Sequence, residues 1–187
     1  MKSLSVDGVR VWAHGRTVRC ASVVLAVDGY APLLERTLAR WIAPGRMLLV
    51  TTAPLSGQPL PGPCYADYGY EYARSLPDGR LLLGAWRRPR PEPEFDESLR
   101  EGLDRFIARY FPEAQNHIAD HRSGIVGLTP DGLPILGSLA HMPQVAFAVG
   151  FGSWGLSWAL VAADRLTRRL LNGEDLGILA VERLDRK

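Results

Sequence analysis

The sequence has little of what a disulfide-stapled or metal-bound domain requires. Cys20 and Cys64 are its only two cysteines among 187 residues, and they are far apart in the chain. They form no C-x-x-C pair, and the four histidines show no ligand spacing. These absences exclude a disulfide framework and a zinc site, and we predict no metal.

The sequence also lacks an excess of one charge and any long apolar run. Its 22 basic and 20 acidic residues are interleaved, for a net charge of +2. No basic stripe could therefore follow a phosphate backbone, and nucleic acid is not an expected partner. The N-terminal residues contain no apolar run of signal-peptide length, and the longest apolar run elsewhere falls well short of a membrane span. We expect a soluble, cytoplasmic protein.

The composition is that of a folded domain, with 47% hydrophobic and 22% charged residues. Apolar and polar residues alternate on both sides of His14-Gly15, which predicts a β-hairpin. Residues 23–27 are apolar throughout and are followed by Asp28-Gly29. They predict a strand covered on both faces, as in a parallel sheet. The neighbours of such a strand must come from elsewhere in the fold.

The rest of the chain switches between helical and strand periodicity. Tyrosines alternate at Tyr65, Tyr68, Tyr70 and Tyr72 before a Pro77-Asp78-Gly79 turn, which predicts a second hairpin. The other expected elements are a helix at 32–40, a strand at 47–52, a loop at 54–63, an amphipathic helix carrying Leu99, Leu103, Phe106, Ile107 and Tyr110, strands at 117–127 and 145–149, and a helix at 154–171 stopped by Asn172-Gly173.

Two glycine-rich segments are the candidates for chemistry. Residues 124–137 hold four glycines and two prolines among apolar residues, which indicates either a buried path around a ligand or a packed turn. Gly150-Phe151-Gly152-Ser153-Trp154-Gly155 matches G-x-G-x-x-G between a strand and a helix. A helix start of this kind offers free amides to an electron-rich group. Too few residues follow for a complete dinucleotide-binding domain, so the motif alone supports such a site weakly.

In their order, these segments resemble the C-terminal half of the D-amino-acid-oxidase-like FAD oxidoreductases, which include glycine oxidase, sarcosine oxidase and the gamma-glutamylputrescine oxidoreductases. The resemblance spans nearly the whole chain. It is carried by residues 23–30, by Leu76-Pro77-Asp78-Gly79-Arg80 with the apolar run after it, by Phe111-Pro112, by residues 124–137 with Thr129-Pro130-Asp131-Gly132-Leu133-Pro134 at their centre, and by Gly150-Phe151-Gly152.

The resemblance implies FAD as cofactor and a set of residues near its ring. These cofactor-binding candidates are Thr129, Asp131, Gly132, Pro134, Gly137, Gly150, Phe151, Gly152, Ser153, Trp154 and Gly155. The helix start would present amides to the N1 and C2 carbonyl region, where reduced flavin carries negative charge. No catalytic residue is named.

The chain departs from the family pattern at three positions. Trp154 stands where family members often have histidine, and Arg122 stands where an aromatic residue is common. Val126 corresponds to an arginine that holds the substrate carboxylate in glycine oxidase. These departures favour an amine or secondary amino compound over a simple amino acid.

Substrate candidates are Arg46, Tyr70 and Arg122. Each residue could instead have a purely structural role. Tyrosines that alternate on a strand often form one buried face and one solvent-exposed face, and arginines often form surface salt bridges.

The expected fold is mixed α/β (α+β), with an antiparallel substrate-domain sheet and the C-terminal part of a FAD-binding domain, incomplete without an N-terminal half. Residues 1–42 would end the FAD-binding domain with a hairpin and a buried strand, 43–123 would form the substrate domain with one helix, and 124–187 would be the flavin-facing segment and helix.

The resemblance implies FAD-dependent oxidation of a C–N bond of an amine or amino acid to an imine. The isolated chain is expected to be inactive until a second polypeptide supplies the ADP-binding half. The alternatives are a non-catalytic remnant or interaction module of the same fold and, more weakly, a small nucleotide-binding protein.

Overall fold

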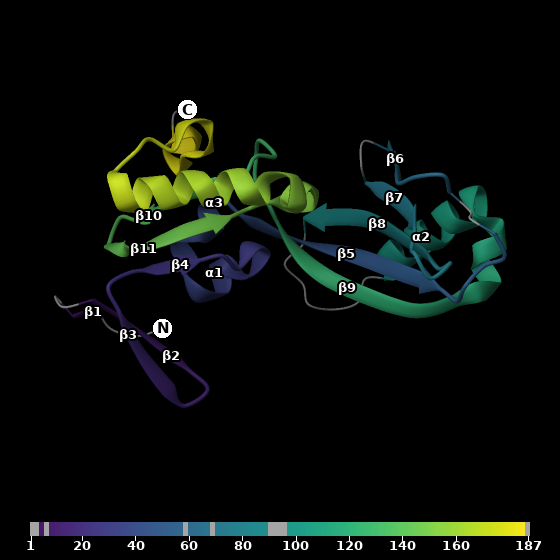
Figure 1. Cartoon of the computed structure of the whole chain (residues 1–187), viewed down its shortest axis with the longest axis horizontal. Coiled ribbons are helices and arrows are strands. Elements are labelled where there is room, and N and C mark those ends of the chain that lie inside the picture. Colours follow the sequence, from purple (N-terminus) through teal and green to yellow (C-terminus); the bar gives the residue numbers. More distant parts are fainter. Residues whose placement is uncertain (1–3, 6–7, 58–59, 68–69, 90–96, 186–187) are drawn as a thin grey trace. The chain divides into compact units, whose positions relative to one another are not determined.

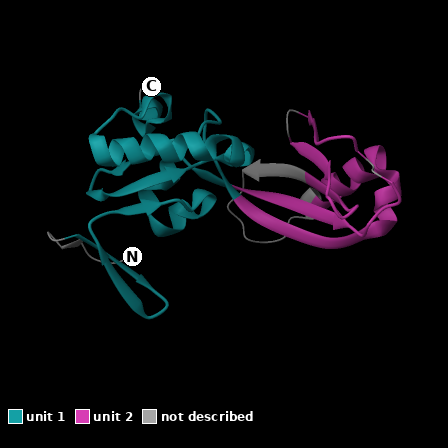
Figure 2. Ribbon diagram, in the orientation of Figure 1, with its two compact units in different colours: residues 1–44, 126–187 teal, residues 45–125 magenta. Residues whose placement is uncertain are grey.

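The computed structural model describes the chain except residues 1–3, 6–7, 58–59, 68–69, 90–96 and 186–187. The described residues form two compact units (Figure 2). Unit 1 consists of residues 1–44 and 126–187, and unit 2 consists of residues 45–125. Unit 2 is therefore inserted in the sequence of unit 1. Tyr68, one of the alternating tyrosines, lies outside the described residues.

Unit 1 is built on a three-stranded sheet in the order β10 (Ile135–Leu139), β11 (Met142–Val149), β4 (Val23–Leu25). Strand β11 is antiparallel to β10 and parallel to β4. Helix α3 (Gly155–Asn172) lies along one face of this sheet (Figure 1), where Ala162 and Leu166 pack against side chains of β10 and β11. The short helix α1 (Ala31–Leu34) packs into the core on the other face.

The strand predicted at residues 23–27 is parallel to its neighbour, as expected, but it is shorter and is covered on one face only. Leu25 is buried, whereas Val24 is 45% exposed. The prediction of two covered faces is therefore wrong for the described residues, because α3 covers β10 and β11 and does not cover β4.

The helix predicted at residues 32–40 is broken at Glu35. Helix α1 ends at Leu34, and a separate 3₁₀ turn runs over Arg36–Arg40. Glu35 has an extended backbone, with φ −139° and ψ 103°, and its Oε1 accepts a hydrogen bond of 2.9 Å from the amide of Thr37. Capping of the second turn by this carboxylate competes with a continuous helix.

The N-terminal hairpin is confirmed. Strands β2 (Gly8–Ala13) and β3 (Arg16–Cys20) are antiparallel, and the short β1 (Leu4–Ser5) pairs with β2. His14 and Gly15 form the turn with positive φ values of 48° and 76°, as a tight two-residue hairpin requires.

Unit 2 is a five-stranded sheet covered by one helix. The strand order is β6 (Cys64–Ala66), β7 (Glu71–Ser75), β8 (Leu81–Pro89), β5 (Ala43–Thr52), β9 (Ile118–Leu128). Helix α2 (Glu97–Tyr110) buries Leu103, Phe106 and Ile107 against the sheet. The predicted hairpin around Pro77-Asp78-Gly79 and the predicted amphipathic helix are both confirmed.

The C-terminal helix is confirmed and strand β10 was missed. Gly173 ends α3 in the left-handed conformation, with φ 72°, as the Asn172-Gly173 signal predicts. The irregular glycine-rich path predicted over residues 124–137 includes residues 135–137, yet Ile135–Leu139 form a strand paired with β11. The pattern hides this strand because four of its five residues are buried and no polar alternation marks it.

Tyr72 of β7 lies across Gly84 of β8, its direct cross-strand partner. A Cβ added to Gly84 would overlap the Tyr72 ring. On the other side, the rings of Tyr72 and Tyr65 are 6.0 Å apart between centroids. The glycine therefore makes room for an aromatic side chain that packs flat over the sheet.

We expect Gly84→Ala to lower the free energy of unfolding by about 1–3 kcal/mol, because the new methyl group must displace the Tyr72 ring. Chemical denaturation would measure the loss. In a Tyr72→Ala background, the same substitution should cost little, because the ring is gone. An equal cost in both backgrounds would contradict the proposed overlap.

Candidate functional site

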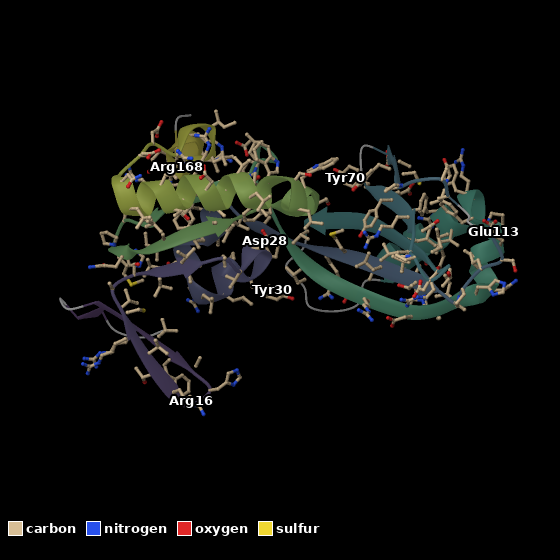
Figure 3. The ribbon with its side chains drawn as sticks, in the orientation of Figure 1. Arg16, Asp28, Tyr30, Tyr70, Glu113 and Arg168 are labelled. Atoms are coloured by element: carbon tan, nitrogen blue, oxygen red, sulfur yellow. The ribbon has the colours of Figure 1, made fainter. Side chains whose placement is uncertain are left out.

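Three segments of unit 1 meet at the carboxylate of Asp28 (Figure 3): the residues after β4, the last residues of β9 and the residues after β11. Asp28 follows β4 and has a left-handed backbone with φ 44°. Its Oδ2 accepts a hydrogen bond of 2.7 Å from the amide of Gly127, at the end of β9. Its Oδ1 accepts one of 2.8 Å from the amide of Phe151, just after β11. One side chain thus joins both glycine-rich segments to the end of β4.

Glycine is required where these segments meet. A Cβ on Gly127 would lie 2.9 Å from Asp28 Oδ1 and 3.1 Å from the Cα of Gly150. Gly150 has φ 77°, and a Cβ there would lie 2.5 Å from Cγ2 of Thr129. A side chain at either position would push the segments apart.

The turn at residues 129–133 is closed by its own side chains. The Thr129 hydroxyl donates to the Leu133 carbonyl over 2.9 Å, and the Leu133 amide donates to Asp131 Oδ1 over 3.1 Å. Arg183 holds the turn from outside: its Nε lies 2.7 Å from Asp131 Oδ2 and its Nη2 lies 2.9 Å from the Leu133 carbonyl. Hydrogen bonding from this guanidinium lowers the pKa of Asp131, and the partial burial of the carboxylate opposes the shift.

The start of α3 has no cap from its own first turn. The 3₁₀ turn Gly152–Trp154 leads into the helix, and among the described residues neither has a side-chain cap or an acidic residue in its first turn. The Ser153 hydroxyl is buried and has no hydrogen-bond partner within the described part of the chain. An electron-rich ligand group could accept from this hydroxyl and from the neighbouring amides.

All eleven predicted cofactor residues lie in unit 1, but their roles differ. Gly150, Phe151 and Gly152 lie at the Asp28 junction and the helix start. The Thr129 hydroxyl and the Asp131 carboxylate already form hydrogen bonds that stabilise the turn at residues 129–133. A Cβ on Gly137 would lie 2.8 Å from Phe147 and 2.9 Å from Val181. The remaining members are Gly132, Pro134, Ser153, Trp154 and Gly155; Pro134 is buried, whereas Trp154 is exposed.

The three predicted substrate residues lie in unit 2 on different elements. Arg46 of β5 donates to the Ser123 hydroxyl over 3.1 Å. Arg122 of β9 is 76% exposed and forms a 2.7 Å ion pair with Asp120. Tyr70 is exposed in the turn before β7 (Figure 3). A substrate role for any of them stays a prediction.

Two residues that organise the site were missed by sequence reasoning. The sequence marks Asp28 only as the end of a predicted strand. Its position between an apolar strand and a glycine is the one local feature that could have indicated its role. Arg183 is 52 positions from its partner Asp131, and no local signal marks it.

Neither a metal-binding cluster nor a membrane-spanning helix occurs among the described residues. They contain no group of three or more histidine, cysteine, aspartate or glutamate side chains that could hold a metal ion. None of the helices traced there is both long and apolar enough to cross a membrane.

A family model and several curated proteins match this chain. The profile of the DAO family, described as FAD dependent oxidoreductase, matches residues 2–169. A relative from Burkholderia multivorans, the tRNA 5-methylaminomethyl-2-thiouridine biosynthesis bifunctional protein MnmC, is 31% identical over 190 residues. The match covers 84% of this chain and 28% of the relative. The protein of the same name from Burkholderia vietnamiensis is 31% identical over 195 residues, covering 89% of this chain and 29% of the relative.

Solved structures share the fold at lower identity. L-proline dehydrogenase from P. horikoshii superposes with a TM-score of 0.75 at 18% identity, covering 92% of this chain and 49% of that protein. Glycine oxidase from Bacillus cereus gives 0.76 at 15% identity, covering 95% and 49%. The predicted mixed α/β fold is confirmed, and the chain spans about half the length of these proteins.

We expect Asp28→Asn to lower the free energy of unfolding by about 1–3 kcal/mol, because an amide has one acceptor oxygen for two backbone donors. Denaturation would measure the loss, and amide exchange should accelerate at Gly127 or Phe151. Asp67→Asn is the matched control, because Asp67 also has a positive φ of 46° but is exposed. Equal effects of the two substitutions would contradict the role of Asp28.

The Asp131–Arg183 pair should stabilise the chain at neutral pH and lose its effect in acid. Because folding lowers the pKa of Asp131, the contribution is present above the unfolded pKa of about 4 and is lost as pH falls through the lower folded value. The difference in unfolding free energy between the native chain and Asp131→Asn should therefore shrink below about pH 4. A difference that stays constant from pH 7 to pH 2 would contradict this prediction.

Proposed function

Because the chain belongs to the DAO family of FAD dependent oxidoreductases, we propose that it forms the flavin-facing half of an enzyme that oxidises a C–N bond of an amine to an imine. The observation that carries the proposal is the start of α3, where the buried Ser153 hydroxyl has no hydrogen-bond partner among the described residues and no described side chain caps the helix. A hydrogen bond from the Phe151 amide to Asp28 holds the segment that leads into this helix, and a second one from the Gly127 amide holds the end of β9 on the same carboxylate.

The residues at this junction fit the electron-rich edge of a flavin ring. Ser153 would donate a hydrogen bond, and the amides of Gly152 and Gly155 would stabilise negative charge together with the helix dipole. Gly150 would keep the backbone close to the turn at residues 129–133, because a side chain there collides with Thr129. When bound, FAD supplies the electron-accepting chemistry, and the chain supplies orientation and electrostatic stabilisation.

The ADP-binding half is proposed to lie outside these 187 residues. Solved relatives of the fold are about twice as long as the matched region, since 49% of the B. cereus glycine oxidase is covered. Without contacts to the pyrophosphate, the chain alone should bind FAD weakly. Residues 43–123 are proposed as the substrate domain, with Arg46, Tyr70 and Arg122 as candidate contacts.

A tRNA-borne amine is a second candidate substrate. The Burkholderia relatives are named for biosynthesis of 5-methylaminomethyl-2-thiouridine in tRNA, and the methylaminomethyl group contains C–N bonds. The same bond type would then be oxidised on a nucleoside instead of a free amine. The interleaved charges of this chain favour the free amine.

We expect the purified chain to show a protein-bound flavin spectrum only when FAD and the polypeptide encoded directly upstream are both present. Visible absorption after removal of free FAD is the measurement. Anaerobic addition of a secondary amine or of tRNA to the flavin complex would then distinguish the two substrate classes by bleaching of the flavin band. No bound flavin in any mixture would favour the interaction-module alternative.

Ser153→Ala should weaken flavin binding about tenfold through loss of one hydrogen bond. Ser157→Ala is the matched control, because Ser157 is exposed on α3. Flavin fluorescence titration would compare the two variants, and equal affinities would remove Ser153 from the site.

A further inference from the structure

The N-terminal hairpin packs on unit 1 by one face and leaves its other face open to solvent. Val9 of β2 is 3% exposed and belongs to the core, and Val11 and Cys20 pack against that core. Side chains alternate between the two faces of a strand, so the residues between these three point away from the core. The resulting outer face of the hairpin is formed by four exposed residues: Arg10, Trp12, Thr17 and Arg19.

The strand register places two arginines directly opposite each other on this outer face. Arg10 of β2 is the cross-strand partner of Arg19 of β3. Like charges at directly opposed positions destabilise a strand pair. Residues 8–27 contain no aspartate or glutamate, and within the described part of the chain neither arginine forms an ion pair. The folded hairpin therefore concentrates positive charge without a counter-charge of its own.

An exposed tryptophan lies beside this pair of charges. Trp12 is two residues from Arg10 on the same face of β2, and it lies diagonally across the strand pair from Arg19. Its side chain is 63% exposed. Arg16, next to the hairpin turn, is also exposed and extends the positive charge toward the tip (Figure 3). An aromatic ring among guanidinium groups suits a ligand that has both flat aromatic faces and negative charge.

We propose that the outer face of the hairpin binds RNA at a loop whose bases are unstacked. Phosphate oxygens accept bidentate hydrogen bonds from guanidinium groups, so one phosphate between Arg10 and Arg19 would remove the repulsion of this pair. An unstacked base would pack on Trp12, because aromatic side chains are the usual stacking platforms for single-stranded RNA. A membrane surface fits less well, because a single tryptophan among arginine and threonine side chains offers little apolar area.

The inference rests on the proposed function and adds a binding surface to its second candidate substrate, the tRNA-borne amine. The charge balance of the whole chain does not favour that candidate, because basic and acidic residues are interleaved along the sequence. Strand pairing changes the distribution of charge in space, because it brings Arg10 and Arg19 together from two different strands. The hairpin belongs to unit 1, so one compact unit would carry both the RNA surface and the flavin-facing segments.

The test is binding of a fluorescently labelled tRNA to the full chain, measured by fluorescence anisotropy without FAD. We expect Trp12→Ala to weaken binding about tenfold, because one stacked base is lost, and Trp12→Phe to retain most of the affinity. Arg10→Gln should weaken binding and reduce the slope of log affinity against log salt concentration by about one, because one phosphate contact is lost.

The matched control is Arg36→Gln. Arg36 is exposed in unit 1, lies outside the hairpin and has no ion pair among the described residues. This variant should bind tRNA as the native chain does, and circular dichroism would check that all variants fold.

Four results would overturn the proposal: no binding of tRNA, equal effects of Arg10→Gln and Arg36→Gln, equal losses in Trp12→Phe and Trp12→Ala, or tighter binding to vesicles of phosphatidylserine and phosphatidylcholine than to tRNA. The flavin measurement separates this inference from the proposed function. Binding of tRNA through the hairpin by a chain that takes up no FAD in any mixture would retain the RNA surface and reject the flavin role. Bleaching of bound flavin by a secondary amine without any binding of tRNA would do the reverse.

Discussion

The two hydrogen bonds accepted by the Asp28 carboxylate are the constraint on which the arrangement of unit 1 depends. They join residues 99 and 123 positions away in the sequence, at 2.7 Å and 2.8 Å. Hydrogen bonds to a charged group are the strong ones in proteins, and here both donors are backbone amides, one near the end of β9 and one just after β11. The carboxylate accepts from both amides, so the chain can bring three strand ends together with these two donors paired.

Glycine placement follows from this junction. Gly127 and Gly150 are needed because the segments approach within the space of a Cβ, whereas Gly137 is needed because Phe147 and Val181 fill its surroundings. Glycine is thus required by the close approach of two backbone segments at Gly127 and Gly150, and by side-chain packing at Gly137. Sequence pattern alone treats all of them as one glycine-rich stretch, which is why packing and ligand contact could not be distinguished in advance.

Elements governed by local periodicity could be predicted, and those governed by distant partners could not. Helix α2 follows from its apolar spacing, and the N-terminal hairpin follows from His14-Gly15. The break at Glu35 depends on a competing carboxylate cap, and β10 is buried at four of its five positions, so neither left a clear pattern. Within the candidate site, the glycine motif before α3 was visible. Asp28 and Arg183 were not, because each acts on a segment more than fifty residues away.

The insertion of unit 2 has a consequence for the order in which the chain can fold. Unit 1 is interrupted after residue 44 and resumes at residue 126, so β4 and β11 cannot pair until the intervening chain has been closed into a loop. Strands β5 and β9, which enter and leave unit 2, are neighbours in one sheet. Once that sheet forms, the two ends of the interruption are held close together, and most of the loop-closure entropy has already been lost. If unit 2 forms early, the pairing of β4 with β11 no longer requires closure of a long flexible loop. Early formation of unit 2 would therefore speed the folding step that assembles the Asp28 junction.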